Sequence, residues 1–294
     1  MPDAGTTARA GGAGGHAWAA AAGPARARAG IRASAWLACW LALAPGARAA
    51  GPPGEVVPAA PACDAARFRV ALDVGHSRAN PGSTSARGVP EFEYNLRLAR
   101  AVSDALAGAG FTSRVLIGES GAAISLDERT RIARREGARL FLSLHHDSVQ
   151  PHYLEDWQVD GVTRRYSDRF RGYSVFVSGL NRQARASEAF AVLLGQGLLR
   201  EGLTPSLHHA EPIPGENRPL LDARIGLYRF DGLAVLRTAE MPAVLLEAAV
   251  IVHRAEEEQV RDGRVARRVA AAVAGAVRRF CDAGAGRSAP GMPP

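Results

Sequence analysis

The chain has 294 residues, of which 47% are hydrophobic and 22% are charged. This balance is that of a globular protein, and it excludes an intrinsically disordered chain or a membrane protein with many spans. All 36 basic residues are arginine, and they exceed the 29 acidic residues by seven. A basic chain can bind a polyanion such as nucleic acid, so the position of this charge along the sequence matters.

The first 49 residues have the features of a secretory signal peptide with a long basic region before its apolar part. An apolar stretch at 33–44 follows several arginines, and Ala47-Arg48-Ala49 supplies a cleavage site of small residues. A helix over that stretch would span about 18 Å, which is too short for the roughly 30 Å core of a bilayer. We therefore expect export to the periplasm or cell wall, with no stable membrane insertion after signal removal. The alternative is a buried helix behind a disordered leader.

Removal of this signal also removes most of the positive charge. Residues 1–50 contain five arginines and one acidic residue, whereas the remainder contains 31 arginines and 28 acidic residues. The net charge is therefore +4 in the first part and +3 in the second. A surplus of three over the mature chain is too small to indicate nucleic acid binding, and we expect no nucleic acid partner.

The remaining sequence predicts a linker at 50–63, a single α/β domain at 64–282 and a disordered tail at 283–294. Hydrophobic periodicity separates strands from helices within the domain. In chain order we predict a strand at 67–73, a helix at 93–109, a strand at 113–117, a helix at 126–136, strands at 140–144 and 173–178, a helix at 187–201, strands at 233–236 and 243–246, and a helix at 260–280. This alternation predicts a twisted, mostly parallel or mixed sheet of about six strands flanked by helices.

Several features have two interpretations. Cys63 and Cys281 flank the domain and could form a disulfide in an oxidising compartment or remain two buried thiols. Residues 149–172 are interpreted as a plain surface excursion, with a lid over the active site as the alternative. His208 and His209 are predicted to be solvated rather than to contact substrate, and the acidic run at 256–258 is predicted to be a solvated helix start.

Polar residues that could carry chemistry follow three predicted strands. His76 follows the first strand, His145 follows the third, and Glu247 ends the last, while Glu91 lies where the first loop meets its helix. In open α/β sheets, functional groups collect beyond the carboxyl ends of the strands. Two histidines and one carboxylate could hold a zinc ion and leave one position for water. A single histidine is more often a core or surface residue, so the convergence of these residues on one edge carries the hypothesis.

Five motifs resemble those of the zinc-dependent N-acetylmuramoyl-L-alanine amidases of the type 3 family, and they occur in that family's order. The motifs are Asp73-Val74-Gly75-His76, Glu91 to Leu96, Leu126-Asp127-Glu128-Arg129, Leu140 to Ser148 and Met241 to Glu247. The sequence departs from the family's motifs at two of these places. The residue after the first histidine is Ser77, where the family has Gly, and the segment after Glu247 lacks the family's Gly-Phe-x-Ser-Asn.

The resemblance implies a zinc amidohydrolase that cleaves the amide between N-acetylmuramic acid and L-alanine in peptidoglycan. It implies one Zn²⁺ held by His76, Glu91 and His145, with Glu247 as the catalytic base. Orienting or substrate-binding positions are further expected at Asp73, Asn95, Arg129 and His146, with an exposed position as the alternative for His146. An activator protein is a further expected partner. A zinc peptidase acting on stem peptides and a non-catalytic wall-binding domain are the competing hypotheses.

Overall fold

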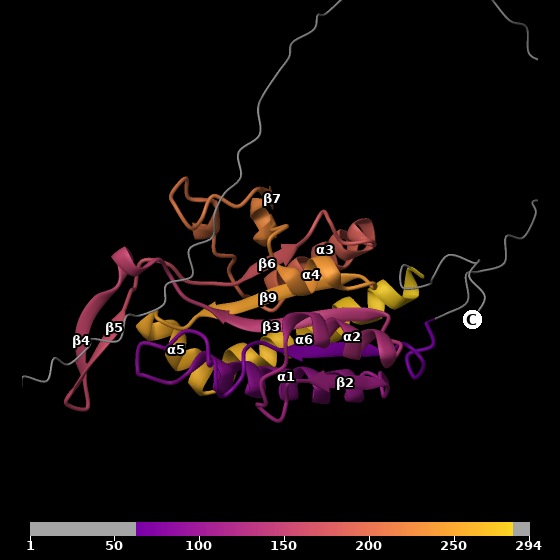
Figure 1. The fold of residues 1–294 in the computed structure, drawn as a ribbon, viewed down its shortest axis with the longest axis horizontal. Helices are drawn as coiled ribbons and strands as arrows, with labels where there is room; N and C mark the ends of the chain where they lie inside the picture. Colours follow the sequence, from indigo (N-terminus) through magenta and orange to yellow (C-terminus); the bar gives the residue numbers. More distant parts are fainter. Residues whose placement is uncertain (1–62, 285–294) are drawn as a thin grey trace, which may run out of the picture. The chain divides into compact units, whose positions relative to one another are not determined.

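The structure is a computed structural model that describes residues 63–284 (Figure 1). The predicted signal peptide, nearly all of the predicted linker and the end of the predicted tail lie outside the described residues. The described chain belongs to one compact unit. Its elements are β1 (Val70–Val74), α1 (Glu91–Gly108), β2 (Arg114–Ile117), α2 (Leu126–Arg135), β3 (Leu140–Asp147), β4 (Glu155–Val159), β5 (Val162–Tyr166), β6 (Ser174–Val177), α3 (Ala184–Arg200), β7 (Leu220–Asp222), β8 (Leu227–Arg229), α4 (Ala234–Thr238), β9 (Ala243–Val250), α5 (Arg254–Arg261) and α6 (Arg264–Asp282).

A seven-stranded mixed sheet forms the centre of the fold, in the order β2-β1-β3-β9-β6-β8-β7. Strands β2, β1, β3 and β9 run parallel, whereas β6 pairs antiparallel with β9. This arrangement confirms the predicted α/β domain and adds the short strands β7 and β8, which the sequence did not predict. The continuous apolar run of β3 fits its interior position, because strands buried on both faces need no alternation.

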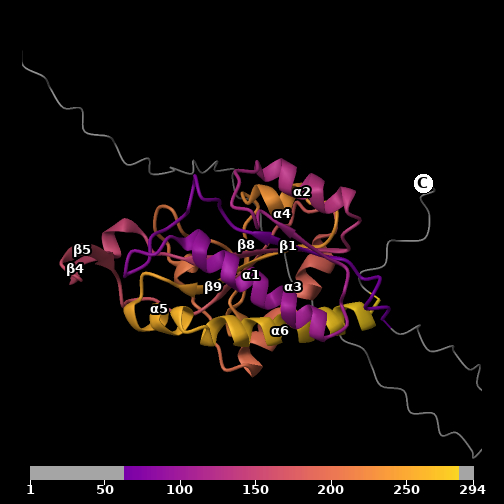
Figure 2. The same ribbon diagram turned by 90° about the horizontal axis from the view of Figure 1, so that it is seen from below.

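Helices cover both faces of the sheet (Figure 2). Helices α1, α3 and α6 pack on one face, and α2 and α4 pack on the other. Alternate side chains of one strand serve the two faces: Leu142 and Leu144 join the larger core, and Phe141 joins the smaller core. Helix α2 begins as predicted, because the Ser125 side chain accepts a hydrogen bond from the Glu128 backbone. Within residues 63–284, no helix combines the length and apolar character needed to cross a membrane.

The structure corrects two predicted elements. The segment predicted as a strand at 233–236 forms helix α4, because its short apolar run fits a helix against the smaller core equally well. The predicted last helix is divided into α5 and α6 by Gly263, whose φ of 76° lies in the left-handed region that favours glycine.

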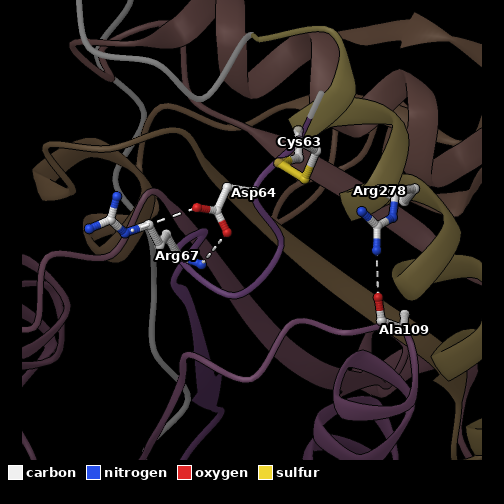
Figure 3. Close-up of a disulfide and its surroundings, with 6 residues drawn as sticks. Cys63, Asp64, Arg67, Ala109 and Arg278 are labelled. Carbon is white, nitrogen blue, oxygen red and sulfur yellow. Dashed lines mark hydrogen bonds and ion pairs between the residues drawn. A yellow bond between two sulfur atoms is a disulfide. The ribbon is translucent and has the colours of Figure 1, made fainter. Parts of the chain in front are cut away.

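Cys63 and Cys281 form a disulfide across 218 residues of sequence (Figure 3). The bridge joins the first described residue to the last turns of α6. A further link beside it comes from Arg278, which donates a hydrogen bond to the backbone carbonyl of Ala109 after α1 (Figure 3). Of the two interpretations of these cysteines, the disulfide is therefore the one that the structure supports.

Residues 149–172 contain a two-stranded hairpin, β4–β5, which extends beyond the end of the main sheet (Figure 1). Its Trp157 donates a hydrogen bond of 2.9 Å to the carbonyl of Ala86, and Arg254 lies 3.9 Å over the ring of Tyr166. These contacts join the hairpin to the loop before α1 and to the start of α5. The hairpin itself is a surface excursion, whereas Phe170, in the same segment, stacks on the buried ring of His208.

Candidate active site

The three predicted ligands meet at the carboxyl ends of β1 and β3. Nε2 of His76 lies 3.1 Å from one carboxylate oxygen of Glu91, and Nδ1 of His145 lies 3.1 Å from the other. One donor atom from each residue lies within 4.8 Å of the other two. The structure therefore brings His76, Glu91 and His145 together as a cluster of two imidazoles and one carboxylate that could hold a divalent metal ion.

Two glycines allow this close approach. A methyl group at Gly75 would lie 2.4 Å from the His145 ring, and one at Gly82 would lie 2.4 Å from Oε2 of Glu91. Real Cβ atoms do not come so near to other heavy atoms, so neither position tolerates a side chain without displacing a ligand. Gly82 also has a φ of 78°, which disfavours any other residue.

Asn95 and His146 hold the Glu91 carboxylate in place. The Asn95 amide donates to Oε1 of Glu91 at 3.0 Å, and its own oxygen accepts a hydrogen bond of 2.8 Å from Nδ1 of His146. Burial lowers the pKa of His146 to about 4, so its ring is neutral. The backbone amides of Ser83 and His146 complete the hydrogen bonds to Glu91.

The charge on Glu91 is stabilised by its partners. Burial acts to raise the pKa of this carboxyl, but hydrogen bonds and positive charge from His145 and His76 outweigh burial and hold the pKa far below its usual range. A carboxylate that stays ionised when buried is the form in which Glu can bind a metal ion.

Asp73 and Arg129 act on the backbone beneath His76. Both side chains are buried. Nη1 of Arg129 lies 2.6 Å from Oδ1 of Asp73, and the other carboxylate oxygen, Oδ2, accepts a hydrogen bond from the Ser143 hydroxyl. The Arg129 guanidinium also donates to the carbonyls of Val74 and His76. His76 has a φ of 68°, an uncommon conformation for a residue with a side chain. The contacts of Asp73 thus reach His76 through Arg129 and not through the imidazole ring.

Glu247 lies on β9 directly opposite His145 on β3. Among the described residues, its Oε2 is one of two buried side-chain polar atoms that have no hydrogen-bond partner. Burial raises the pKa of Glu247 well above its usual value, and the negative charges of Asp147 and Glu91 act in the same direction. The side chain borders a cavity of about 170 Å³, whose walls include Phe176, His209, Glu216, Arg218 and Phe230.

His208 and His209 correct a prediction. They were expected to be solvated, but the His208 side chain is 2% exposed and the His209 side chain is 13% exposed. Both face Asp147, at the end of β3, and the three side chains form a second group that could hold a metal ion. Burial alone would lower the pKa of His209, but Asp147 and Glu216 outweigh burial and raise the pKa to about 10. Phe170 stacks on His208, and Phe176 meets His209 edge-on.

The acidic run at 256–258 also differs from its prediction. Glu257 is fully buried and accepts hydrogen bonds from Ser85, Arg87 and Tyr94, so it anchors the loop that leads to Glu91. Glu256 accepts hydrogen bonds from the backbone amides of Gly172 and Val250, while only Glu258 is exposed. Glu257 is therefore buried and Glu256 half-buried, and each is held by partners from other elements.

This fold and cluster match a known family. The family model described as N-acetylmuramoyl-L-alanine amidase matches residues 70–279. That range covers most of the chain and contains every candidate site residue. The chain therefore belongs to the type 3 family of N-acetylmuramoyl-L-alanine amidases.

Individual relatives are distant. A curated protein from Haemophilus influenzae, described as probable N-acetylmuramoyl-L-alanine amidase AmiB, is 24% identical over 236 residues, which cover 70% of this chain and 50% of the relative. The chain thus spans about half the length of the curated relative that it matches. The catalytic domain of the amidase CwlV from Bacillus (Paenibacillus) polymyxa var. colistinus has a TM-score of 0.55 and 24% identity over 73% of this chain and 98% of that one. The amidase Ami1 from Mycobacterium smegmatis has a TM-score of 0.58 and 20% identity over 74% and 98%. These structures share the fold.

Proposed function

We propose that this protein is an exported zinc amidase that hydrolyses the amide between N-acetylmuramic acid and L-alanine in peptidoglycan, in wall remodelling, cell separation or lysis. The observation that carries the proposal is the position of Glu247. This residue presents a buried, unpartnered carboxylate oxygen beside the cluster of His76, Glu91 and His145. Family membership supports the choice of substrate.

The donor set of the cluster fits Zn²⁺. Imidazole and carboxylate are ligands that zinc uses, and three protein ligands leave a coordination position open, as in catalytic zinc sites. His76, Glu91 and His145 would hold the ion, and Asn95 would orient Glu91. A bound zinc ion supplies Lewis-acid polarisation of the scissile carbonyl and lowers the pKa of a bound water to about 7.

Glu247 moves the proton in this proposal. Its raised pKa makes the carboxylate a stronger base than an exposed glutamate. Oε2 takes a proton from the attacking water and then delivers it to the amine nitrogen of L-alanine as that group leaves. The adjoining cavity has room beside Glu247 for part of the substrate, with Phe176 and Phe230 as apolar walls and Arg218 as a cation.

Export is part of the same proposal. A disulfide that closes the domain is typical of proteins that fold in an oxidising compartment. This agrees with the signal peptide proposed for residues 1–49 and with a catalytic domain at 64–282. We also propose that an activator protein acts on this enzyme. The fold relative CwlD from Clostridioides difficile, at 15% identity and a TM-score of 0.53, has been solved in complex with the lipoprotein GerS.

Digestion of purified sacculi tests the proposed reaction. Mass spectrometry should find intact stem peptides that begin with L-alanine, and glycan strands whose lactyl groups have been freed. A chelator should abolish this release. Cleavage inside the stems would instead identify a peptidase, and binding to sacculi without any product would identify a wall-binding domain.

The variant Glu247→Gln tests the assigned role. General base catalysis contributes about 10²–10⁴-fold, so the variant should lose activity by at least that factor. It should still bind zinc with the stoichiometry of the wild type. Glu240→Gln is the matched control, because Glu240 is an exposed carboxylate just before the same strand. Full activity in Glu247→Gln would refute the assignment.

A further inference from the structure

We propose that Asp147, His208 and His209 form a second binding site for a divalent transition-metal ion of the zinc class, apart from the cluster around Glu91. The site takes its carboxylate from the end of β3 and its two imidazoles from the short 3₁₀ helix His208–Ala210. The inference concerns metal binding by these residues and does not depend on amidase activity.

The donor atoms converge on one point. Oδ2 of Asp147 lies 2.8 Å from Nε2 of His209 and 3.4 Å from Nε2 of His208, and the two imidazole rings lie 3.9 Å apart between centroids. One donor atom of each residue lies within 4.8 Å of the others. Two imidazoles and one carboxylate form the same donor set as in the cluster of His76, Glu91 and His145.

The outer nitrogens of both rings are already engaged. Nδ1 of His208 lies 2.8 Å from the hydroxyl of Ser206, and Nδ1 of His209 lies 2.8 Å from Oε2 of Glu216. Histidines that bind metals characteristically use their second nitrogen in this way, since a carboxylate or other oxygen then fixes the ring orientation. Both Nε2 atoms are thereby turned toward Asp147.

His208 supplies an independent observation. Its side chain is 2% exposed, and Nε2 is the second buried polar atom in residues 63–284 that has no hydrogen-bond partner. The stacked ring of Phe170 shields the imidazole from solvent. Leaving a buried nitrogen without a partner is unfavourable, and a cation held jointly with Asp147 would give it one.

The charge around the site favours a cation. Asp147 and Glu216 both face the imidazoles, so two carboxyl groups surround the two rings. His209 and Glu216 also line the cavity that Glu247 borders. A metal ion bound here would therefore place positive charge at the wall of the cavity beside the proposed base.

The alternative is an ion pair in which a protonated His209 bridges Asp147 and Glu216 without any metal. The two arrangements differ in stoichiometry, because the structure contains two clusters that could each hold one ion. Metal-free full-length protein would be titrated with Zn²⁺ in competition with a chromophoric chelator. We expect two ions per chain in the wild type, one in His145→Ala, one in His208→Ala and none in the double variant.

His253→Ala is the matched control, because His253 is a buried histidine outside both clusters, and this variant should bind two ions. Unfolding provides a readout besides stoichiometry. Zn²⁺ should raise the Tm of His145→Ala, because an ion in the second site links β3 to the loop at 206–210, and it should leave the double variant unchanged. A single ion in the wild type that only His145→Ala loses would overturn the proposal.

A direct measurement covers the case in which His208→Ala fails to fold. Wild-type crystals containing Zn²⁺ would be measured at X-ray energies above and below the zinc absorption edge. An anomalous difference peak among Asp147, His208 and His209 is the expected result. Full occupancy at Glu91 with no peak at this second position would show that the site is an ion pair.

Discussion

The side-chain amide of Asn95 donates a hydrogen bond of 3.0 Å to Oε1 of Glu91, one turn earlier on α1. Asn95 is fully buried, and its oxygen is occupied by His146. Both ends of the amide are therefore engaged, and its rotation is fixed. The consequence is that α1 carries both a proposed metal ligand and the residue that orients that ligand.

Replacement of Asn95 should weaken metal binding. In Asn95→Ala, Glu91 loses one hydrogen bond, and we expect zinc affinity to fall by about 10–100-fold, as is typical when an orienting partner is removed. Competition with a chelator of known affinity measures the change. Arg100→Ala, on the exposed side of the same helix, should bind zinc as the wild type does. Unchanged affinity in Asn95→Ala would show that Glu91 is held adequately without the amide.

Gly82 offers a test of how tightly the cluster is packed. Gly82→Ala would place a methyl group 2.4 Å from Oε2 of Glu91, so the variant should lose at least tenfold in zinc affinity and lose activity. Gly202→Ala is the matched control, since Gly202 has a similar φ of 75° and nothing within 4 Å of its added methyl group. Both variants should lose about 1 kcal/mol of stability from backbone strain, but only Gly82→Ala should affect zinc. Equal zinc affinity in the two variants would contradict the predicted clash.

The disulfide should contribute strongly to stability. Reduction of the bond between Cys63 and Cys281 should lower the free energy of unfolding by about 2–5 kcal/mol, because the open chain gains conformational entropy when it unfolds. Urea unfolding with and without a reductant measures this difference. The double variant Cys63→Ala/Cys281→Ala should be as unstable as the reduced protein and should not respond to the reductant. If its stability equals that of the oxidised wild type, the bridge is energetically neutral.

The carboxyl of Glu256 should make the stability of the fold depend on pH. Burial raises the pKa of its carboxyl from 4.5 to about 7, so between these values the folded chain retains a proton that the unfolded chain releases. The protonated Glu256 carboxyl thus contributes about 3 kcal/mol to the free energy of unfolding. This contribution is fully present below about pH 4.5 and is lost as the pH rises to about 7. The difference in unfolding free energy between wild type and Glu256→Gln, measured from pH 4.5 to 8, should shift in favour of the variant by that amount.

A neighbouring carboxylate serves as the control for this titration. Glu258 lies on the same helix with a side chain that is 59% exposed. Glu258→Gln is measured beside Glu256→Gln and should not reproduce the change of about 3 kcal/mol, because this side chain is not buried. The raised pKa would be refuted if the difference in unfolding free energy between the wild type and Glu256→Gln did not vary with pH.

The sequence predicted the part of the fold that periodicity determines. Runs such as 140–144 are buried on both faces, and their apolar character indicates central strands without any knowledge of their partners. The candidate residues followed from the same logic, since parallel strands bring His145 and Glu247 to one edge of the sheet. Three elements are too short for the period of a strand to be distinguished from that of a helix, namely β7, β8 and α4.

The buried polar residues were harder to predict because their partners are remote in sequence. His208 looks like a loop residue until Phe170 covers it, and Glu257 looks solvated until Arg87 and Tyr94 reach it from the other end of the domain. Local sequence contains no record of such partners. The only local signal was a pair of adjacent histidines flanked by prolines, and this pattern does not show whether a loop is covered.

The disulfide also determines how the domain responds to mechanical load. Cys63 and Cys281 lie at the two ends of the folded unit, with all seven strands of the sheet between them in sequence. Tension applied to the chain on either side would pass directly from one sulfur atom to the other. The hydrogen bonds between strands would bear none of it. Stretching the oxidised protein between its termini should therefore give no unfolding step from this domain, whereas the reduced protein should extend.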